Sequence, residues 1–200
     1  MDSIFAGPHR PTWCCDPDLP GRGVCGFTLI EVLVVMAIVS ALTAVAVPSF
    51  RSMADSLRLT AASNAFLAHL YLARSEAIKR RGRVVVCKSP DGLACAASGG
   101  WEQGRLIFHD ANNNGVLDAG ELVIATEDRL QPGLRLTGNQ TVARYVSFDA
   151  MGTTRLVGGG FQAGTLTLCR QALAPNEARQ IILNALGRPR VHKVQVDACM

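Results

Sequence analysis

Few side chains in this 200-residue sequence have a spacing that suggests chemistry. The four histidines stand far apart in the chain, at His9, His69, His109 and His192. None of them has partners at the spacing of a metal site or of a catalytic nucleophile, and no glycine-rich phosphate loop is present. The sequence therefore predicts a protein that is not an enzyme.

One segment, residues 110–121, has the spacing of a calcium-binding loop. Oxygen-bearing side chains recur at alternate positions around a turn glycine, and they are Asp110, Asn112, Asn114, Asp118 and Glu121. The flanking residues predict strands rather than the two helices of an EF-hand. Asp and Asn side chains also hydrogen-bond to nearby backbone and stabilise hairpin turns. We favour this structural turn over a calcium site. We therefore expect no cofactor, and calcium is the only one that the sequence offers as an alternative.

Positive charge is concentrated in the last third of the chain. Residues 27–130 contain ten Lys and Arg against ten Asp and Glu, whereas residues 131–200 contain eight against three. The densest part is Gly187-Arg188-Pro189-Arg190, with Lys193 following. Glycine suits a turn and proline stiffens it, so this loop would present two guanidiniums. Such a patch favours binding to the phosphates of a polyanion.

The longest element that the sequence predicts is an apolar helix near the N-terminus. From Phe27 to Val47 the only ionisable side chain is Glu31, and Pro48 is predicted to end this apolar run. Twenty-one helical residues reach about 31 Å, the thickness of a bilayer core. A core helix is the alternative, but few globular cores hold so long a run. Because a carboxylate is costly in lipid, Glu31 predicts a functional partner.

Beyond this run the residue pattern changes twice. Residues 51–82 predict an amphipathic helix with Gly82 as its C-cap, because small and apolar residues recur every three or four positions. The basic cluster Lys79–Arg83 would bind nucleic acid or, as we favour, form a solvated helix end. Residues 83–200 predict a β-rich head, with strands at 83–87, 101–109, 121–126, 134–137, 143–148, 154–157, 164–170, 180–184 and 190–196.

These elements predict an α+β fold. A long N-terminal helix, whose first half (residues 27–50) is transmembrane, would pack on a C-terminal antiparallel β-sandwich or two-sheet head. The apolar stripe of residues 51–82 would cover one sheet.

The stretch Gly26-Phe27-Thr28-Leu29-Ile30-Glu31 before an apolar helix resembles the processing site of type IV pilins and type II secretion pseudopilins. The resemblance implies that residues 1–26 are a leader, that prepilin peptidase cleaves between Gly26 and Phe27, and that Phe27 is methylated. Glu31 would pair with the N-terminal amine of a neighbouring pilin in the filament. The protein would be a single-pass bacterial inner-membrane protein with its head in the periplasm. This leader, with two arginines against three aspartates, lacks the basic character usual in the family.

Loss of the leader would leave four of the seven cysteines. An even number in an exported chain predicts two disulfides, which three pairings could form. We favour Cys87–Cys95, which closes a short loop, and Cys169–Cys199, which ties the C-terminal strand to its neighbour. A zinc site is the alternative, although the paired close spacing of a cysteine-rich ribbon is missing.

The C-terminal part resembles one branch of these proteins, the GspH/FimT family, which shares the processing motif, an Asp/Asn/Gly-rich hairpin and a Gly-Arg near the C-terminus. In FimT-type minor pilins, a Gly-Arg-x-Arg motif is associated with DNA capture in natural transformation. Gly187, Arg188 and Arg190 fit it, and Lys193 adds charge. The resemblance implies a DNA-binding minor pilin that also assists pilus assembly. A structural turn at Gly-Arg, in a structural pseudopilin of a type II secretion system, is the alternative.

Overall fold

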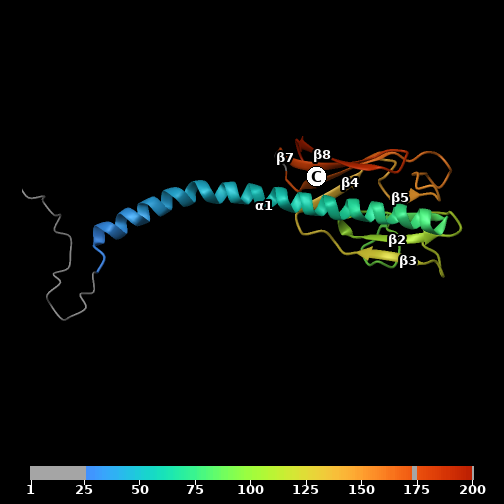
Figure 1. Ribbon diagram of the computed structural model, residues 1–200, viewed down its shortest axis with the longest axis horizontal. Helices are drawn as coiled ribbons and strands as arrows, with labels where there is room; N and C mark the ends of the chain where they lie inside the picture. Colours follow the sequence, from blue (N-terminus) through green and yellow to red (C-terminus); the bar gives the residue numbers. More distant parts are fainter. Residues whose placement is uncertain (1–25, 173–174, 200) are drawn as a thin grey trace, which may run out of the picture. The chain divides into compact units, whose positions relative to one another are not determined.

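The computed structural model describes residues 26–172 and 175–199 (Figure 1). The chain divides into two compact units, residues 1–50 and 51–200. The predicted leader lies, except for Gly26, outside the described residues, as do Cys14, Cys15 and Cys25.

A single helix, α1 (Leu29–Arg80), begins in the first unit and ends in the second. The backbone N–H of Glu31 donates to the Thr28 hydroxyl over 3.3 Å, which caps the first turn. Pro48 closes the apolar run but lies inside α1, so the run continues directly into the amphipathic segment as one long helix. Proline removes only one backbone donor, and the surrounding turns continue the helix despite that loss. The first part of α1 is long and apolar enough to cross a membrane, and its side chains are exposed.

The C-terminus of α1 is closed by a residue other than the one predicted. Arg81 has a left-handed backbone with a φ of 52°, and its N–H donates to the carbonyl oxygen of Ile78 over 3.3 Å. The N–H of Gly82 donates to the carbonyl oxygen of Ala77 over 3.2 Å, which completes a Schellman motif. Gly82 lies against the His109 ring, and a Cβ there would be 2.5 Å from Nε2 of His109, so the imidazole would have to move aside.

The head contains two four-stranded antiparallel sheets. Sheet A has the order β3-β2-β1-β5, from β1 (Arg83–Lys88), β2 (Arg105–Asp110), β3 (Val123–Glu127) and β5 (Tyr145–Phe148). Sheet B has the order β4-β6-β7-β8, from β4 (Leu134–Gly138), β6 (Gly164–Arg170), β7 (Asn176–Leu183) and β8 (Pro189–Val196). The predicted α+β fold with a two-sheet head is confirmed.

Two of the predicted strand positions were wrong. The chain at Trp101–Gln103 forms a 3-10 turn, η1, before β2 begins. There the indole N–H of Trp101 donates to the carbonyl oxygen of Val142 over 3.0 Å. This hydrogen bond ties η1 to the segment before β5. Residues 154–157 make only isolated bridges, Phe148 to Thr154 and Arg155 to Phe161. The hydroxyl of Thr154 donates to the carbonyl oxygens of Gln162 and Asn184, and its N–H donates to that of Ala185, all of which lie outside the strands.

The main core joins the second half of α1 to both sheets. Strand alternation turns one side chain in two toward the helix, and the buried set includes Phe66, Leu70, Val84, Val86, Ile107, Leu166, Leu168 and Ile181. Figure 1 shows β7 and β8 of sheet B and β2 and β3 of sheet A on opposite sides of this half of α1. The helix therefore covers both sheets, not one as the sequence predicted.

The other face of sheet A is buried too. Val85, Cys87, Leu106 and Phe108 form a second cluster on which Leu117 packs. Leu117 belongs to the loop between β2 and β3, which holds the calcium-like spacing. This loop therefore covers an apolar face.

Candidate functional site

Gly187 shapes the hairpin between β7 and β8. Its φ is +71°, and its N–H donates to the carbonyl oxygen of Asn184 over 3.0 Å. The next N–H, of Arg188, donates to Oδ1 of the Asn184 side chain over 3.0 Å. A Cβ at position 187 would lie 2.1 Å from the carbonyl oxygen of Gly152. Only glycine fits this turn. The two hydrogen bonds to Asn184 hold the turn in this conformation.

Arg188 and Arg190 are exposed on either side of the buried Pro189. Neither guanidinium has a hydrogen-bond or ion-pair partner among the described residues. Strand register places Arg190 opposite Ile182, and His192 opposite Gln180. The only acid in the four strands of sheet B is Glu177. The two guanidiniums thus remain available to an external anion.

Lys193 is not brought together with these arginines. Residues three apart on a strand point to opposite faces, and Lys193 Nζ lies 2.5 Å from Oε2 of Glu177. Glu177 Oε1 in turn accepts a hydrogen bond of 2.5 Å from Arg179. The other end of the Arg179 guanidinium donates to the Thr60 hydroxyl of α1 over 3.0 Å. Lys193 therefore takes part in a polar network between sheet B and the helix.

This network predicts an acid-dependent loss of stability that Glu177→Gln would abolish. The Lys193 hydrogen bond, aided by Arg179 and Ser56, lowers the pKa of Glu177 from 4.5 to about 2. A depressed carboxyl pKa stabilises the fold above the unfolded-state pKa, and this contribution is lost as pH falls through the folded-state value. The gap in melting temperature between wild type and Glu177→Gln should narrow between pH 4.5 and about 2. Circular dichroism melts at each pH measure it, and a full gap at the acid end would contradict the assignment.

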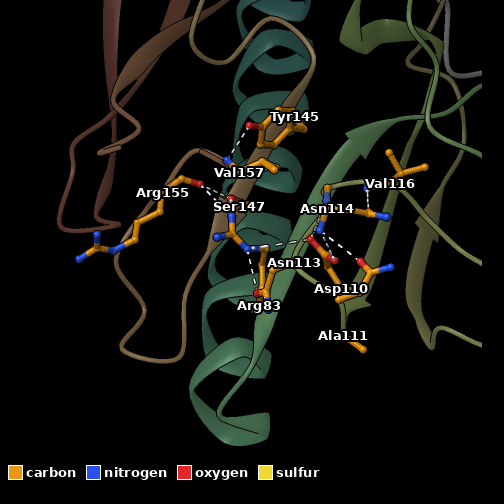
Figure 2. A network of polar contacts seen from close by, with 12 residues as sticks. Arg83, Asp110, Ala111, Asn113, Asn114, Val116, Tyr145, Ser147, Arg155 and Val157 are labelled. Atoms are coloured by element: carbon orange, nitrogen blue, oxygen red, sulfur yellow. Dashed lines mark hydrogen bonds and ion pairs between the residues drawn. The ribbon is translucent and has the colours of Figure 1, made fainter. Parts of the chain in front are cut away.

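The loop between β2 and β3 uses its oxygens internally. Oδ1 and Oδ2 of the buried Asp110 accept hydrogen bonds from the backbone N–H groups of Asn114 and Gly115 over 3.0 and 2.8 Å. Glu121 likewise accepts from the N–H groups of Ala111 and Asp118. Figure 2 shows Asp110 beside Asn114 and close to Arg83, whose Nε lies 3.9 Å from Oδ2 of Asp110.

Two of the three asparagine amides of this loop, those of Asn112 and Asn114, are oriented by backbone hydrogen bonds. Oδ1 of Asn112 accepts from the N–H of Asn114, and Oδ1 of Asn114 accepts from the N–H of Val116. Both NH2 groups therefore point to Oδ2 of Asp118, over 2.8 and 2.7 Å. Calcium would need oxygens where these donors lie. No group of three or more His, Cys, Asp or Glu within residues 26–172 and 175–199 is arranged to hold a metal. Hydrogen bonds within the loop therefore account for the side-chain oxygens of Asp110, Asn112, Asn114, Asp118 and Glu121.

The processing residues lie at the exposed start of α1. Gly26 and Phe27 precede the helix, and the Phe27 side chain is 82% exposed. The Glu31 carboxylate is exposed and has no hydrogen-bond or ion-pair partner in the described part of the chain.

The four cysteines of the head form two disulfides, Cys87–Cys95 and Cys169–Cys199. These are the pairings favoured from the sequence. The first holds the loop after β1 on the second cluster of sheet A. The second ties β6 to the C-terminal segment, where the N–H of Cys199 also donates to the carbonyl oxygen of Ala172.

A buried polar cluster was missed by the sequence analysis. Arg105 is fully buried over the Phe66 ring, and its Nε donates to Nδ1 of His69 over 2.9 Å. Burial, followed by the nearby Arg105 charge, lowers the pKa of His69, so the imidazole is neutral and can accept this bond. Burial also lowers the pKa of Arg105 to about 10. A lone arginine in an apolar strand gave no signal of this pairing across 36 residues of sequence.

Comparison with known proteins gives two family matches. Residues 62–187 match the family described as type II transport protein GspH, and residues 21–47 match the prokaryotic N-terminal methylation motif. A search of curated protein sequences found no match.

Two solved structures of one type IV minor pilin share the fold. A crystal structure of the type IV minor pilin FimU of Pseudomonas aeruginosa is 21% identical, with a TM-score of 0.54, over 74% of this chain and 99% of that one. A second crystal form of FimU is 22% identical, with a TM-score of 0.51, over 71% of this chain and 100% of that one. The minor pseudopilin EpsH of Vibrio cholerae is 15% identical, with a TM-score of 0.45, over 68% of this chain and 96% of that one.

Proposed function

Because this chain belongs to the GspH family and carries an N-terminal methylation motif, we propose that it is a minor pilin of a type IV pilus that binds DNA through Arg188 and Arg190. Binding would serve DNA uptake in natural transformation, and the subunit would also assist pilus assembly. No enzymatic activity is expected of it.

One observation carries the DNA-binding proposal. Two exposed guanidiniums, Arg188 and Arg190, extend from a hairpin fixed by Gly187 and have no partner among the described residues. Guanidinium forks match the geometry of phosphate oxygens, and a fixed hairpin loses little conformational entropy on binding. Because phosphate contacts position a protein without reading bases, binding should show little sequence preference. Lys193 is left out of this site because Glu177 pairs with it.

A salt titration tests the proposal. The full chain in nonionic detergent is titrated with a fluorescent DNA duplex at several salt concentrations, as wild type and as Arg188→Ala/Arg190→Ala. We expect the double variant to bind more weakly and to lose about 0.9 of the logarithmic salt slope for each phosphate contact removed. Arg58→Ala/Arg129→Ala removes the same charge from other exposed positions and serves as the matched control.

The alternative is a structural pseudopilin of a type II secretion system, in which Gly187 only shapes a turn. The collision that a side chain would cause at position 187 also fits this alternative. It predicts that Arg188→Ala/Arg190→Ala and the control variant bind DNA equally weakly. Equal salt slopes for all three proteins would therefore favour the pseudopilin.

In either system we propose the same processing and assembly. Prepilin peptidase would cleave between Gly26 and Phe27, and Phe27 would become the methylated N-terminus. The first part of α1 would lie in the inner membrane, with the head in the periplasm. Glu31 would then pair with the N-terminal amine of a neighbouring pilin, which would offset the cost of its charge in lipid. Calcium is not part of the proposal.

A further inference from the structure

A polar cleft with a volume of about 400 Å³ opens in the head where α1 ends. Four basic side chains line it, Arg80, Arg81, Arg83 and His109. We propose that this helix-end cleft binds a phosphate of the nucleic-acid backbone and extends the site formed by Arg188 and Arg190. The inference rests on the DNA-binding role proposed above, and it adds a second place of contact.

Two of the four basic groups of the helix-end cleft, Arg81 and His109, retain free donors, whereas Nε of Arg80 donates to Glu76 over 2.7 Å. Arg81 is exposed and makes no side-chain hydrogen bond or ion pair with any described residue. The imidazole of His109 is also without a partner among those residues. Arg83 is fixed from behind, because its guanidinium donates to Asn113, Ser147 and the carbonyl oxygen of Arg155 (Figure 2). A fixed cation beside two free donors is a favourable arrangement for an oxyanion.

The two acids at the helix-end cleft are each paired with an arginine, Asp110 with Arg83, which lines the cleft, and Asp149 with Arg155, which does not. The oxygens of Asp110 accept backbone N–H groups of their own loop, and Arg83 lies 3.9 Å away. Oδ1 of Asp149 accepts the backbone N–H groups of Met151 and Thr153. Its Oδ2 accepts from Nε of Arg155 over 2.9 Å. Arg83 and Asp110 therefore offset each other, Arg80 is paired with Glu76, and the unpaired positive charge of the cleft is that of Arg81.

The helix-end cleft and the arginine hairpin adjoin the same loop. Asp149 and Ala150 line the cleft, and Gly152, further along this loop, contacts Gly187 of the hairpin. The loop is held in place by Arg74, whose Nε donates to the carbonyl oxygen of Gly152 over 2.9 Å. Because duplex DNA carries a phosphate charge about every 1.7 Å along its axis, one duplex can engage both places.

Arg81 offers a variant that separates binding from folding. Its left-handed φ of 52° is unfavourable for any residue with a Cβ, whereas glycine adopts it freely. Arg81→Gly should therefore raise the melting temperature while it removes the free guanidinium. A loss of DNA binding by a more stable protein cannot come from misfolding.

The test compares four full-length proteins in nonionic detergent: wild type, Arg81→Gly, Arg188→Ala/Arg190→Ala and Arg129→Ala. Arg129 is an exposed control, and it follows β3 at the end of sheet A opposite to Arg83. Binding to a fluorescent DNA duplex is measured by anisotropy across a salt series. We expect Arg81→Gly to lower the logarithmic salt slope by about 0.9 and Arg129→Ala to leave it unchanged.

Each outcome decides between the sites. If Arg188→Ala/Arg190→Ala loses slope and Arg81→Gly does not, the hairpin binds DNA and this inference is overturned. If Arg81→Gly alone loses slope, the helix-end cleft binds DNA and the proposed role of the hairpin fails. A second measurement compares the melting temperatures of wild type and Arg81→Gly with and without inorganic phosphate. Should phosphate raise the melting temperature of wild type but not of Arg81→Gly, while both bind DNA equally, the cleft is a site for free phosphate and the nucleic-acid assignment is wrong.

Discussion

Asp110→Ala is expected to lower the free energy of unfolding by about 3–5 kcal/mol, as found when one partner of a buried ion pair is removed. The Asp110 side chain is fully buried and accepts two backbone N–H groups, while Arg83 beside it is only 10% exposed. The substitution would leave those donors unpaired and the guanidinium poorly compensated. Chemical denaturation followed by circular dichroism measures the loss.

Asp118→Ala is the matched control in the same loop. Asp118 is exposed and accepts only side-chain N–H groups, from Asn112 and Asn114. Its replacement should therefore cost about 1 kcal/mol or less. Repeating both measurements with calcium and with a chelator adds a test of the alternative interpretation. A large calcium-dependent loss in both variants would show that the loop is a metal site, contrary to its hydrogen bonding.

Trp101→Ala should cost about 3–5 kcal/mol, the usual range for removal of a buried aromatic side chain. The indole is fully buried, with its edge against the Phe66 ring at a centroid distance of 5.4 Å. Its N–H donates to the carbonyl oxygen of Val142 over 3.0 Å, so it links η1 both to α1 and to the segment before β5. The substitution would leave a cavity among three elements.

Trp101→Phe separates the two contributions of this side chain. Phenylalanine retains most of the ring packing but leaves the Val142 carbonyl oxygen unpaired, which costs about 1–3 kcal/mol. Denaturation midpoints of the wild type and both variants give the comparison. If Trp101→Phe were as unstable as Trp101→Ala, the hydrogen bond rather than the packing would dominate, and the cavity argument would be wrong.

Local sequence chemistry predicted much of the fold. The apolar run after Phe27, the three-and-four spacing of residues 51–82 and the alternation of residues 83–87 each produce the expected element. These patterns depend on contacts between near neighbours in the chain. Sequence patterns gave a wrong prediction where the local structure depends on a contact between residues far apart in the chain. Gly82 was predicted to be the helix cap, but Arg81 adopts the left-handed backbone and Gly82 follows it, beside the His109 ring.

At the candidate site, too, the sequence predicted some features and only the tertiary structure decided others. The sequence alone identified Gly187, Arg188 and Arg190, because a turn glycine and two cations lie within four residues. It also placed Lys193 with them, since sequence distance does not distinguish the two faces of a strand. Only the tertiary structure pairs Lys193 with Glu177 and sets Arg81 and His109 around one cleft, 28 residues apart in sequence. The sequence determined which cationic groups the chain carries, and packing of the helix on two sheets decided which of them have no partner among the described residues.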